Sequence, residues 1–272
     1  MSPDLQPRER AQVLSLYPDV LDHAAAVRRV AELVRGGSGG YVCVSTVHMA
    51  MESYDDPEFA AKVNAADVIV TDGMPVVWMQ RLQGKKNATR LRGNDLTLLL
   101  CEYAEANGLK VGFYGGKQVV IEAILERARR DFPNLHIAYA YSPPFRSLAA
   151  EEDVSVTAAI KSAAPDILFV GLGCPKQENW MAAHTNELKS VMLGVGAAFD
   201  FFAGNVKESP AWLGRLGLEW MFRLAQEPGR LWRRYLLLNP RFIMLAIRQL
   251  LQRRESQGWK EPPARKDGIQ GP

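Results

Sequence analysis

Cysteine is scarce in this chain: its 272 residues include three, Cys43, Cys101 and Cys174, at wide spacings. An odd number of widely separated cysteines supports neither a disulfide framework nor a zinc site. The chain also lacks an apolar run near the ~18 residues that a membrane-spanning helix needs, and its polar N-terminus has no apolar signal core. We therefore expect a globular protein of the reducing cytoplasm.

Signatures of several nucleotide and metal sites are missing as well. No Walker phosphate loop is present, no Asp-x-Asp pair suggests a metal–nucleotide clamp, and no cluster resembles a calcium or zinc site. A dinucleotide-dependent oxidoreductase would carry Gly-x-Gly-x-x-Gly after an early strand, whereas the glycine-rich stretch 36–40 precedes the first predicted strand. We expect no metal ion and no other cofactor.

Neither sign of charge dominates the whole chain, but the small net charge of +3 is unevenly distributed. Residues 223–272 hold 11 Lys/Arg and 4 Asp/Glu, a net charge of +7, whereas residues 1–222 carry −4. Such asymmetry indicates an anionic partner: nucleic acid, a membrane surface or phosphate. Leu, Ile, Phe and Trp are interleaved with the basic residues, and this favours a bilayer over nucleic acid.

Short β-rich runs alternate with helical patterns through most of the chain. The predicted strands cover residues 41–45, 67–71, 110–114, 136–140, 167–171 and 191–195. The predicted helices cover residues 22–34, 56–65, 95–107, 117–131 and 151–163. This alternation predicts an α/β fold with a Rossmann-like, mostly parallel sheet flanked by helices.

The pattern divides the chain into three parts. Residues 1–222 are expected to form the catalytic domain, with residues 1–20 as a loosely structured lead-in. Residues 223–254 are expected to form a basic amphipathic helical appendage that docks on a membrane. One face of its helix should present the apolar residues Phe242, Leu245, Ala246, Ile247 and Leu250. Residues 255–272 are polar and contain proline, which predicts disorder.

The stretch 167–180 carries the most informative local pattern. An apolar strand ends in Gly171-x-Gly173, and Pro175 stands where a first helical turn would begin. Three polar residues follow at the mouth of that helix: Lys176, Gln177 and Glu178. A strand, a glycine turn and a helix N-terminus form an anion-binding corner in α/β proteins. A Gly-x-Gly turn without a ligand is the alternative, but packing alone does not explain three adjacent polar residues here.

Other polar or glycine-rich positions follow neighbouring strands, and the carboxyl ends of parallel strands meet at one edge of a sheet. They are Thr46, His48, Asp72, Gly73, Gly115 and Gly116. A carboxylate at Asp72 could act as a general base on a hydroxyl, although Asp-Gly is also a common turn. His48 is either a base or a hydrogen-bonded core residue. Asp200, in a glycine-bracketed apolar loop, flanks a ligand or caps the next segment.

Arg223, Arg230 and Arg233 lie in the basic C-terminal part, and Arg230 and Arg233 share a helix face because they are three residues apart. Converging guanidinium groups bind phosphate oxygens bidentately. A solvated charged face is the alternative.

Taken together, six stretches resemble the bacterial TagA/WecG/CpsF glycosyltransferase family, which acts in teichoic acid, enterobacterial common antigen and exopolysaccharide synthesis. They occur in the family's order and span roughly residues 40–245. The matching stretches are 64–78, 90–96, 113–117, 165–178, 194–204 and 218–230.

The resemblance implies an inverting, metal-independent transfer of a hexose or N-acetylhexosamine from a UDP-sugar to a sugar on a polyprenyl diphosphate. It assigns Asp72 as the base for the acceptor hydroxyl and Arg90 as another site residue. Gln177 and the glycine turns would hold the UDP-sugar. Arg223, Arg230 and Arg233 match arginines of the family's C-terminal appendage, which is thought to close over the site at the membrane and to meet diphosphate.

The resemblance also implies partners and a location. They are the UDP-sugar, the lipid-linked acceptor and the anionic inner face of the cell membrane, with no nucleic acid; assembly as a homo-oligomer stays open. Two departures concern the donor sugar: Val44 and Thr46 stand where the family often has Thr-x-Asn, and residues 206–210 replace Lys-x-x-Arg-Ala-Pro. The competing hypotheses are a nucleotide-cofactor-dependent oxidoreductase and a non-catalytic nucleic-acid-binding protein.

Overall fold

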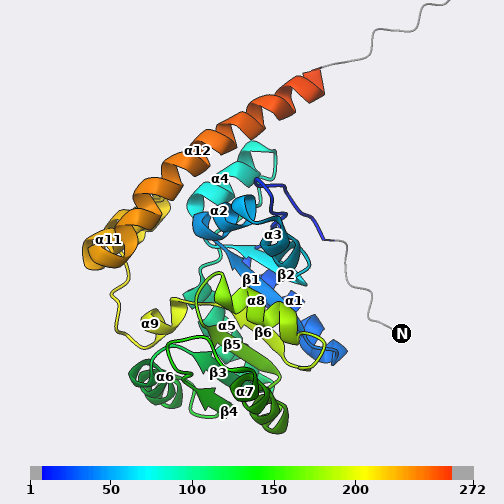
Figure 1. Ribbon diagram of the computed structural model, residues 1–272, viewed down its shortest axis with the longest axis vertical. Helices are drawn as coiled ribbons and strands as arrows, with labels where there is room; N and C mark the ends of the chain where they lie inside the picture. The colour runs from blue at the N-terminus through cyan, green and yellow to red at the C-terminus, as the bar shows by residue number, and fades with distance from the viewer. Residues whose placement is uncertain (1–7, 259–272) are drawn as a thin grey trace, which may run out of the picture.

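The computed structural model describes residues 8–258, except for the side chains at positions 211, 215, 230 and 254–258. Six strands form one all-parallel sheet in the order β2-β1-β6-β5-β3-β4 (Figure 1). The strands are β1 (Gly40–Ser45), β2 (Val68–Thr71), β3 (Lys110–Gly115), β4 (His136–Tyr141), β5 (Ile167–Gly171) and β6 (Val191–Gly194). The predicted α/β class and the Rossmann-like sheet are confirmed.

Helices cover both faces of the sheet. The strands carry apolar side chains on both faces, and burying both sets requires helices on either side. One apolar core lies under α1 (His23–Gly36), α5 (Gly93–Ala106), α6 (Gln118–Asp131) and α9 (Ala198–Phe202). The other lies under α2 (Val47–Asp55), α3 (Pro57–Asn64), α4 (Met74–Leu82), α7 (Ala150–Ala163) and α8 (Lys176–His184). Val42 and Val44 of β1 face the first core, and Cys43 between them faces the second.

The topology places a crevice beside β1. β1 is followed by α2 on one face of the sheet, whereas its neighbour β6 is followed by α9 on the other face, so the connections after these two adjacent strands diverge. Ligands of open α/β sheets bind outside the carboxyl ends of the strands at such a point.

Local caps explain where several helices begin. The Asp22 carboxylate accepts a hydrogen bond from the Ala25 amide at 2.7 Å, and Asp56 accepts from Glu58 and Phe59 ahead of Pro57. Both starts follow the sequence prediction. Neither α2, which Thr46 caps, nor α4, which begins after Gly73, was predicted, because both are short and lack a clear apolar period.

The lead-in is ordered, contrary to the prediction for residues 1–20. Residues 8–20 form a hairpin-like segment whose bridges join Arg10 to Asp19 and Val13 to Leu16. Val13 and Leu16 are fully buried in the second core. Asp19 accepts two bonds from Arg8 and one from the Ile69 amide, so polar contacts hold the segment where the sequence shows no strand or helix period. Residues 1–7 lie outside the described part of the chain.

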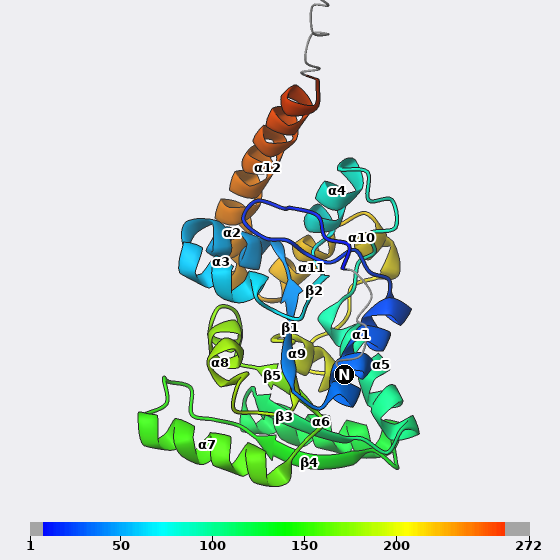
Figure 2. The ribbon, with the colours of Figure 1, turned by 90° about the vertical axis from the view of Figure 1, so that its right-hand side faces the viewer.

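The C-terminal region consists of α10 (Ala211–Arg215), α11 (Glu219–Gln226) and α12 (Pro228–Gly258). The predicted break at residues 227–230 is confirmed, whereas the predicted domain boundary at residue 222 falls inside α11. α12 packs against α2 and α4, and its far end extends beyond the α/β body (Figures 1 and 2). It continues through Pro240 as one helix to Gly258, so the predicted disordered tail starts at least four residues too early; residues 259–272 are not described.

The predicted apolar face of α12 is partly wrong. Phe242 and Ala246 are buried, and Leu245 and Leu250 pack against the same core, but Ile247 is exposed. A turn of 100° per residue moves Ile247 away from Ala246 and onto a second apolar stripe. That exposed stripe consists of Leu236, Leu237, Ile243, Met244, Ile247 and Leu251. Within residues 8–258, no helix is both long and apolar enough to cross a membrane.

Candidate active site

A cleft of about 1230 Å³ opens at the carboxyl ends of the strands. Its walls come from the segments that follow all six strands, together with residues of α11 and α12. The cleft thus lies beside β1, where the topology predicts a ligand site.

Most of the predicted site residues line this cleft. They are Thr46, His48, Asp72, Gly73, Arg90, Gly116, Gly171, Gly173, Lys176, Gln177, Asp200 and Arg223. Gly115, Glu178 and Arg233 are not among the lining residues. Arg230 lies in the first turn of α12, and its side chain is outside the described part of the chain.

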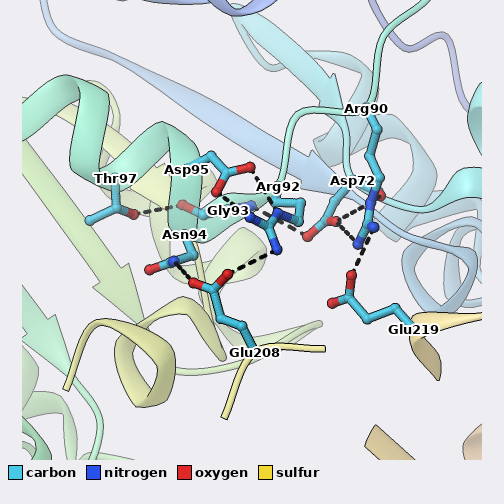
Figure 3. A network of polar contacts seen from close by, with 9 residues as sticks. All are labelled: Asp72, Arg90, Arg92, Gly93, Asn94, Asp95, Thr97, Glu208 and Glu219. Carbon is cyan, nitrogen blue, oxygen red and sulfur yellow. Dashed lines mark hydrogen bonds and ion pairs between the residues drawn. The ribbon is translucent and has the colours of Figure 1, made fainter. Parts of the chain in front are cut away.

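Asp72 follows β2 directly, and its side chain is about one quarter exposed. One carboxylate oxygen, Oδ1, accepts from Nη2 and Nε of Arg90 at 3.0 and 3.3 Å, and the other, Oδ2, accepts from the Gly93 amide at 3.3 Å (Figure 3). A carboxylate oxygen has two acceptor positions, so Oδ2 retains one. Asp72 is therefore oriented by two neighbours and can still accept a proton from a ligand in the cleft.

The contacts of Asp72 belong to a network of charges that joins the α/β body to the C-terminal region (Figure 3). Arg90 also reaches Glu219, the first residue of α11, with 2.8 Å between Nη1 and Oε2. Nearby, Arg92 and Asn94 both contact the Glu208 carboxylate, at 3.3 and 2.8 Å. Two glutamates from residues 208–219 thus lie against the segment that leads into α5.

The turn after β5 has the predicted glycines, but for two different reasons. Gly173 has a φ of +81°, a conformation that favours glycine. A Cβ atom at Gly171 would instead lie 2.4 Å from the Phe199 ring, so this glycine makes room for α9. The Gln177 side chain is almost fully buried and shapes the turn, because its Oε1 accepts from the Gly173 amide at 3.1 Å. The polar run therefore does have a packing role, contrary to the sequence argument.

Glu178 lies fully buried behind the cleft wall. Its Oε1 accepts from Nε2 of Gln177 at 2.7 Å, while Oε2 has no hydrogen-bond partner. Burial raises the pKa of this carboxyl to about 7, against the hydrogen bonds and the charge of Arg234, which lower it. Burial also raises the pKa of the neighbouring Cys174 thiol, which favours an inert thiol over a nucleophile.

Glu178→Gln should therefore change the pH dependence of stability. The raised pKa of Glu178 stabilises the native state below about pH 4.5, and this contribution is lost as pH rises toward 7. Glutamine cannot ionise, so the free energy of unfolding of the variant relative to the wild type should rise by up to about 3 kcal/mol between pH 5 and pH 8. Urea unfolding at both pH values measures this difference.

Glu187→Gln is the matched control, because Glu187 is exposed and Lys161 lowers its pKa. It should show no such rise. An unfolding difference for Glu178→Gln that stays constant across this range would mean that the buried carboxyl is ionised throughout.

Thr46 and His48 both occupy the turn after β1. Thr46 caps α2, with Oγ1 accepting from the Met49 amide at 3.3 Å. Nε2 of His48 lies 3.2 Å from the Glu52 carboxylate, and burial together with the charge of Arg234 lowers the pKa of His48 to about 4. The imidazole is therefore neutral near pH 7, and its contact with Glu52 is a hydrogen bond rather than an ion pair.

Arg234 is a cleft residue that the sequence analysis missed. It follows Arg233, and consecutive helical residues point about 100° apart, so one of the two can face the cleft while the other faces away. Arg233 is exposed, with its guanidinium 5.3 Å from the Trp232 ring centroid. The charge of Arg234 acts on His48, Cys174 and Glu178. The 100° step between consecutive helical residues could have indicated that Arg233 and Arg234 face different ways.

Positive charge and aromatic rings also line the cleft. The basic residues include Lys117, Arg146, Lys176, Arg223 and Arg234, and Arg223 lies over the Phe201 ring at 5.2 Å. Trp180 also lines it, stacked on His184 and held by a bond from Nε1 to Asp153 at 2.9 Å. Such walls suit a ligand with both phosphates and flat rings. The sequence pattern did not reveal Lys117, Arg146 or Trp180.

The described residues contain no group of three or more His, Cys, Asp or Glu side chains that could hold a metal ion. The positive charge in this cleft comes from Lys and Arg side chains.

Comparison with known proteins gives consistent results. The profile of the Glycosyl transferase WecG/TagA/CpsF family matches residues 11–256. An N-acetylglucosaminyldiphosphoundecaprenol N-acetyl-beta-D-mannosaminyltransferase of Bacillus spizizenii is 34% identical over 211 residues, which cover 77% of this chain and 79% of the relative. The enzyme of the same name from Bacillus subtilis is 32% identical, with 76% and 79% covered, and that from Staphylococcus aureus strain MW2 is 35% identical, with 63% and 66% covered.

Proposed function

Because this chain belongs to the WecG/TagA/CpsF family of glycosyl transferases, we propose that it moves a sugar from a UDP-sugar to a sugar on a polyprenyl diphosphate in cell-surface polysaccharide synthesis. The observation that carries this proposal is the position of Asp72, an oriented carboxylate in a cleft that Lys and Arg side chains also line. Neither an oxidoreductase nor a nucleic-acid-binding protein has support in the comparisons.

The relatives' printed names supply the substrate classes. They transfer N-acetylmannosamine to N-acetylglucosaminyl diphosphoundecaprenol, so we assign an N-acetylhexosamine donor and a diphosphate-linked N-acetylhexosamine acceptor to this chain. The donor diphosphate would lie along Lys176 and Arg234, with the uracil ring near Trp180. Arg223 would meet the same charge from α11.

The reaction would be a single displacement. Asp72 takes the proton of the acceptor hydroxyl as the oxygen attacks the anomeric carbon; the bond from that carbon to the UDP oxygen breaks, and UDP leaves with the electron pair. One in-line displacement inverts the anomeric configuration. Guanidinium groups stabilise the charge that develops on the leaving diphosphate, a role that requires no metal ion.

A lipid-linked acceptor requires a membrane-facing surface, and α12 offers one. Its exposed stripe of Leu236, Leu237, Ile243, Met244, Ile247 and Leu251 lies on a helix that also carries the exposed side chains of Arg233 and Arg248. Arg241 and Arg253 of the same helix bond Asp55 and Gln83. Apolar residues beside arginines bind the interface of an anionic bilayer without crossing it. We therefore propose peripheral association with the inner face of the cell membrane.

The direct test is a transfer assay with a short-chain polyprenyl diphosphate N-acetylglucosamine as acceptor and a panel of UDP-sugars as donors. Release of UDP together with a glycosylated lipid is the expected result, with UDP-N-acetylhexosamines fastest. The rate should persist in excess EDTA, since the charge stabilisation comes from side chains. A strict requirement for added Mg²⁺ would contradict the metal-independent step, and lack of transfer with every donor would contradict the function itself.

A further inference from the structure

Glu219 reaches the proposed catalytic base through Arg90. Its carboxylate lies 2.8 Å from Arg90, and the same guanidinium binds Oδ1 of Asp72 (Figure 3). Arg90 and Glu219 are largely buried, with side chains 19% and 15% exposed. The contact between Arg90 and Glu219 is an ion pair at 2.8 Å. Asp72, Arg90 and Glu219 form a chain of alternating charge that ends on α11.

This arrangement decides how much of the positive charge of Arg90 falls on Asp72. A cation beside a carboxylate favours the ionised form and weakens it as a base. A second carboxylate on the same cation draws on part of that positive charge and offsets the effect. Burial strengthens both effects because solvent screens them less.

We propose that Glu219 is a positioning residue which, by sharing Arg90, keeps Asp72 able to accept the proton of the attacking hydroxyl. This inference rests on the proposed role of Asp72 as the base. It also links chemistry to the C-terminal region: while α11 is docked, Arg90 is shared, and when α11 departs, Arg90 is left to Asp72 alone. Docking of α11 and α12 against the α/β body would thereby make Asp72 a stronger base.

The effect of Glu219 on Asp72 can be distinguished from the titration of the surrounding groups. Charged or titratable side chains on the neighbouring elements include His48, Arg92, Asp95, Asp200, Glu208, Arg223, Glu227 and Arg234. The arginines keep their charge, and His48, with a pKa of about 4, is already neutral above pH 5. Glu178 titrates near pH 7 but contacts neither Arg90 nor Glu219, so its effect is the same in variants that retain it.

Glu208 provides a matched control. It lies in the segment that leads into α10, just before the C-terminal region, and also bonds an arginine of the α5 segment. That arginine is Arg92 rather than Arg90, the partner of Asp72. Glu208→Gln removes one negative charge and one contact, as Glu219→Gln does. A role limited to holding the C-terminal region in place predicts similar effects for both variants.

The kinetic experiment measures kcat and KM for the wild type, Glu219→Gln, Glu219→Asp and Glu208→Gln, from the lowest pH at which each protein stays folded up to pH 8.5. Glu219→Gln should shift the acidic limb of kcat to lower pH by about half a unit or more. It should also lower the plateau of kcat about three- to tenfold, because a weaker base removes the proton less effectively. The KM for donor should change less than about twofold. Glu219→Asp should restore the limb, and Glu208→Gln should leave it in place.

A second measurement does not depend on turnover. Carboxyl ¹³C resonances of labelled aspartate, with the Asp72 signal identified by its loss in Asp72→Asn, give the titration midpoint of Asp72 directly. The midpoint should fall in Glu219→Gln and stay constant in Glu208→Gln. An unchanged midpoint in Glu219→Gln would overturn the inference even if its activity were lost. A wild type with no transfer activity would overturn the proposed function instead, and the resonance would still report on the charge sharing.

Discussion

Asp72→Asn is expected to lower kcat for sugar transfer by about 10²–10⁴-fold, the usual contribution of a positioned general base. Asparagine has nearly the same shape but cannot take the hydroxyl proton. Its one carbonyl oxygen can still accept from Arg90, whereas its amide nitrogen replaces the oxygen that accepts the longer bond from the Gly93 amide. The cleft should therefore lose one weak contact and otherwise retain its form. The measurement is single-turnover transfer with saturating donor and acceptor.

Binding of UDP controls for damage to the cleft. The affinity of Asp72→Asn for UDP should stay within about threefold of the wild type, and its Tm should change little. A variant that binds UDP normally and still turns over at the wild-type rate would exclude Asp72 as the base. A variant that loses both UDP binding and its cooperative unfolding transition would show a structural role.

Replacing two apolar residues of the exposed stripe on α12 should separate the enzyme from membranes. In the double variant Ile243→Glu/Ile247→Glu, each side chain loses apolar contact with lipid and gains repulsion from anionic headgroups. Together these effects should reduce partitioning into vesicles rich in anionic lipid by about 10²–10³-fold. Transfer to a long-chain acceptor in those vesicles should fall in proportion, as co-sedimentation and product formation can show.

The control is Val119→Glu/Val154→Glu, which alters two similarly exposed apolar residues on α6 and α7. Its vesicle binding should equal that of the wild type. The double variant on α12 should retain transfer to a water-soluble acceptor, because Phe242 and Ala246 still pack in the core. Undiminished vesicle binding would show that another surface meets the membrane. Deletion after Leu218 is less informative, because it removes those core residues as well.

The sheet and most helices could be predicted from sequence because their signals are local. Asp22 and Asp56-Pro57 mark helix starts, and the apolar runs mark strands that are buried on both faces. The helices α2 and α4 were not predicted because they are short and lack a clear apolar period. The ordered segment at residues 8–20 was not predicted because Arg8, Asp19 and Ile69 make contacts between distant parts of the chain. No local period announces such contacts.

The site shows the same division. Twelve of the sixteen predicted site residues line the cleft, since the ends of parallel strands must meet. Their roles stay predictions. Glu178 was placed in the site for its position in the motif, but its side chain turns inward. Arg234 and Glu219 were missed because their importance depends on where α11 and α12 dock, which a sequence pattern at that distance does not specify.

The contact between Leu14 and Gln249 has a consequence for how the enzyme is made. The Leu14 amide donates to the Gln249 side chain at 2.9 Å, and that side chain donates in turn to the Gln12 carbonyl. These partners are 235 residues apart along the chain. Because synthesis starts at the N-terminus, the α/β body can assemble while α12 is still missing. A nascent chain would therefore acquire its complete cleft last, after the ribosome has made almost all of it.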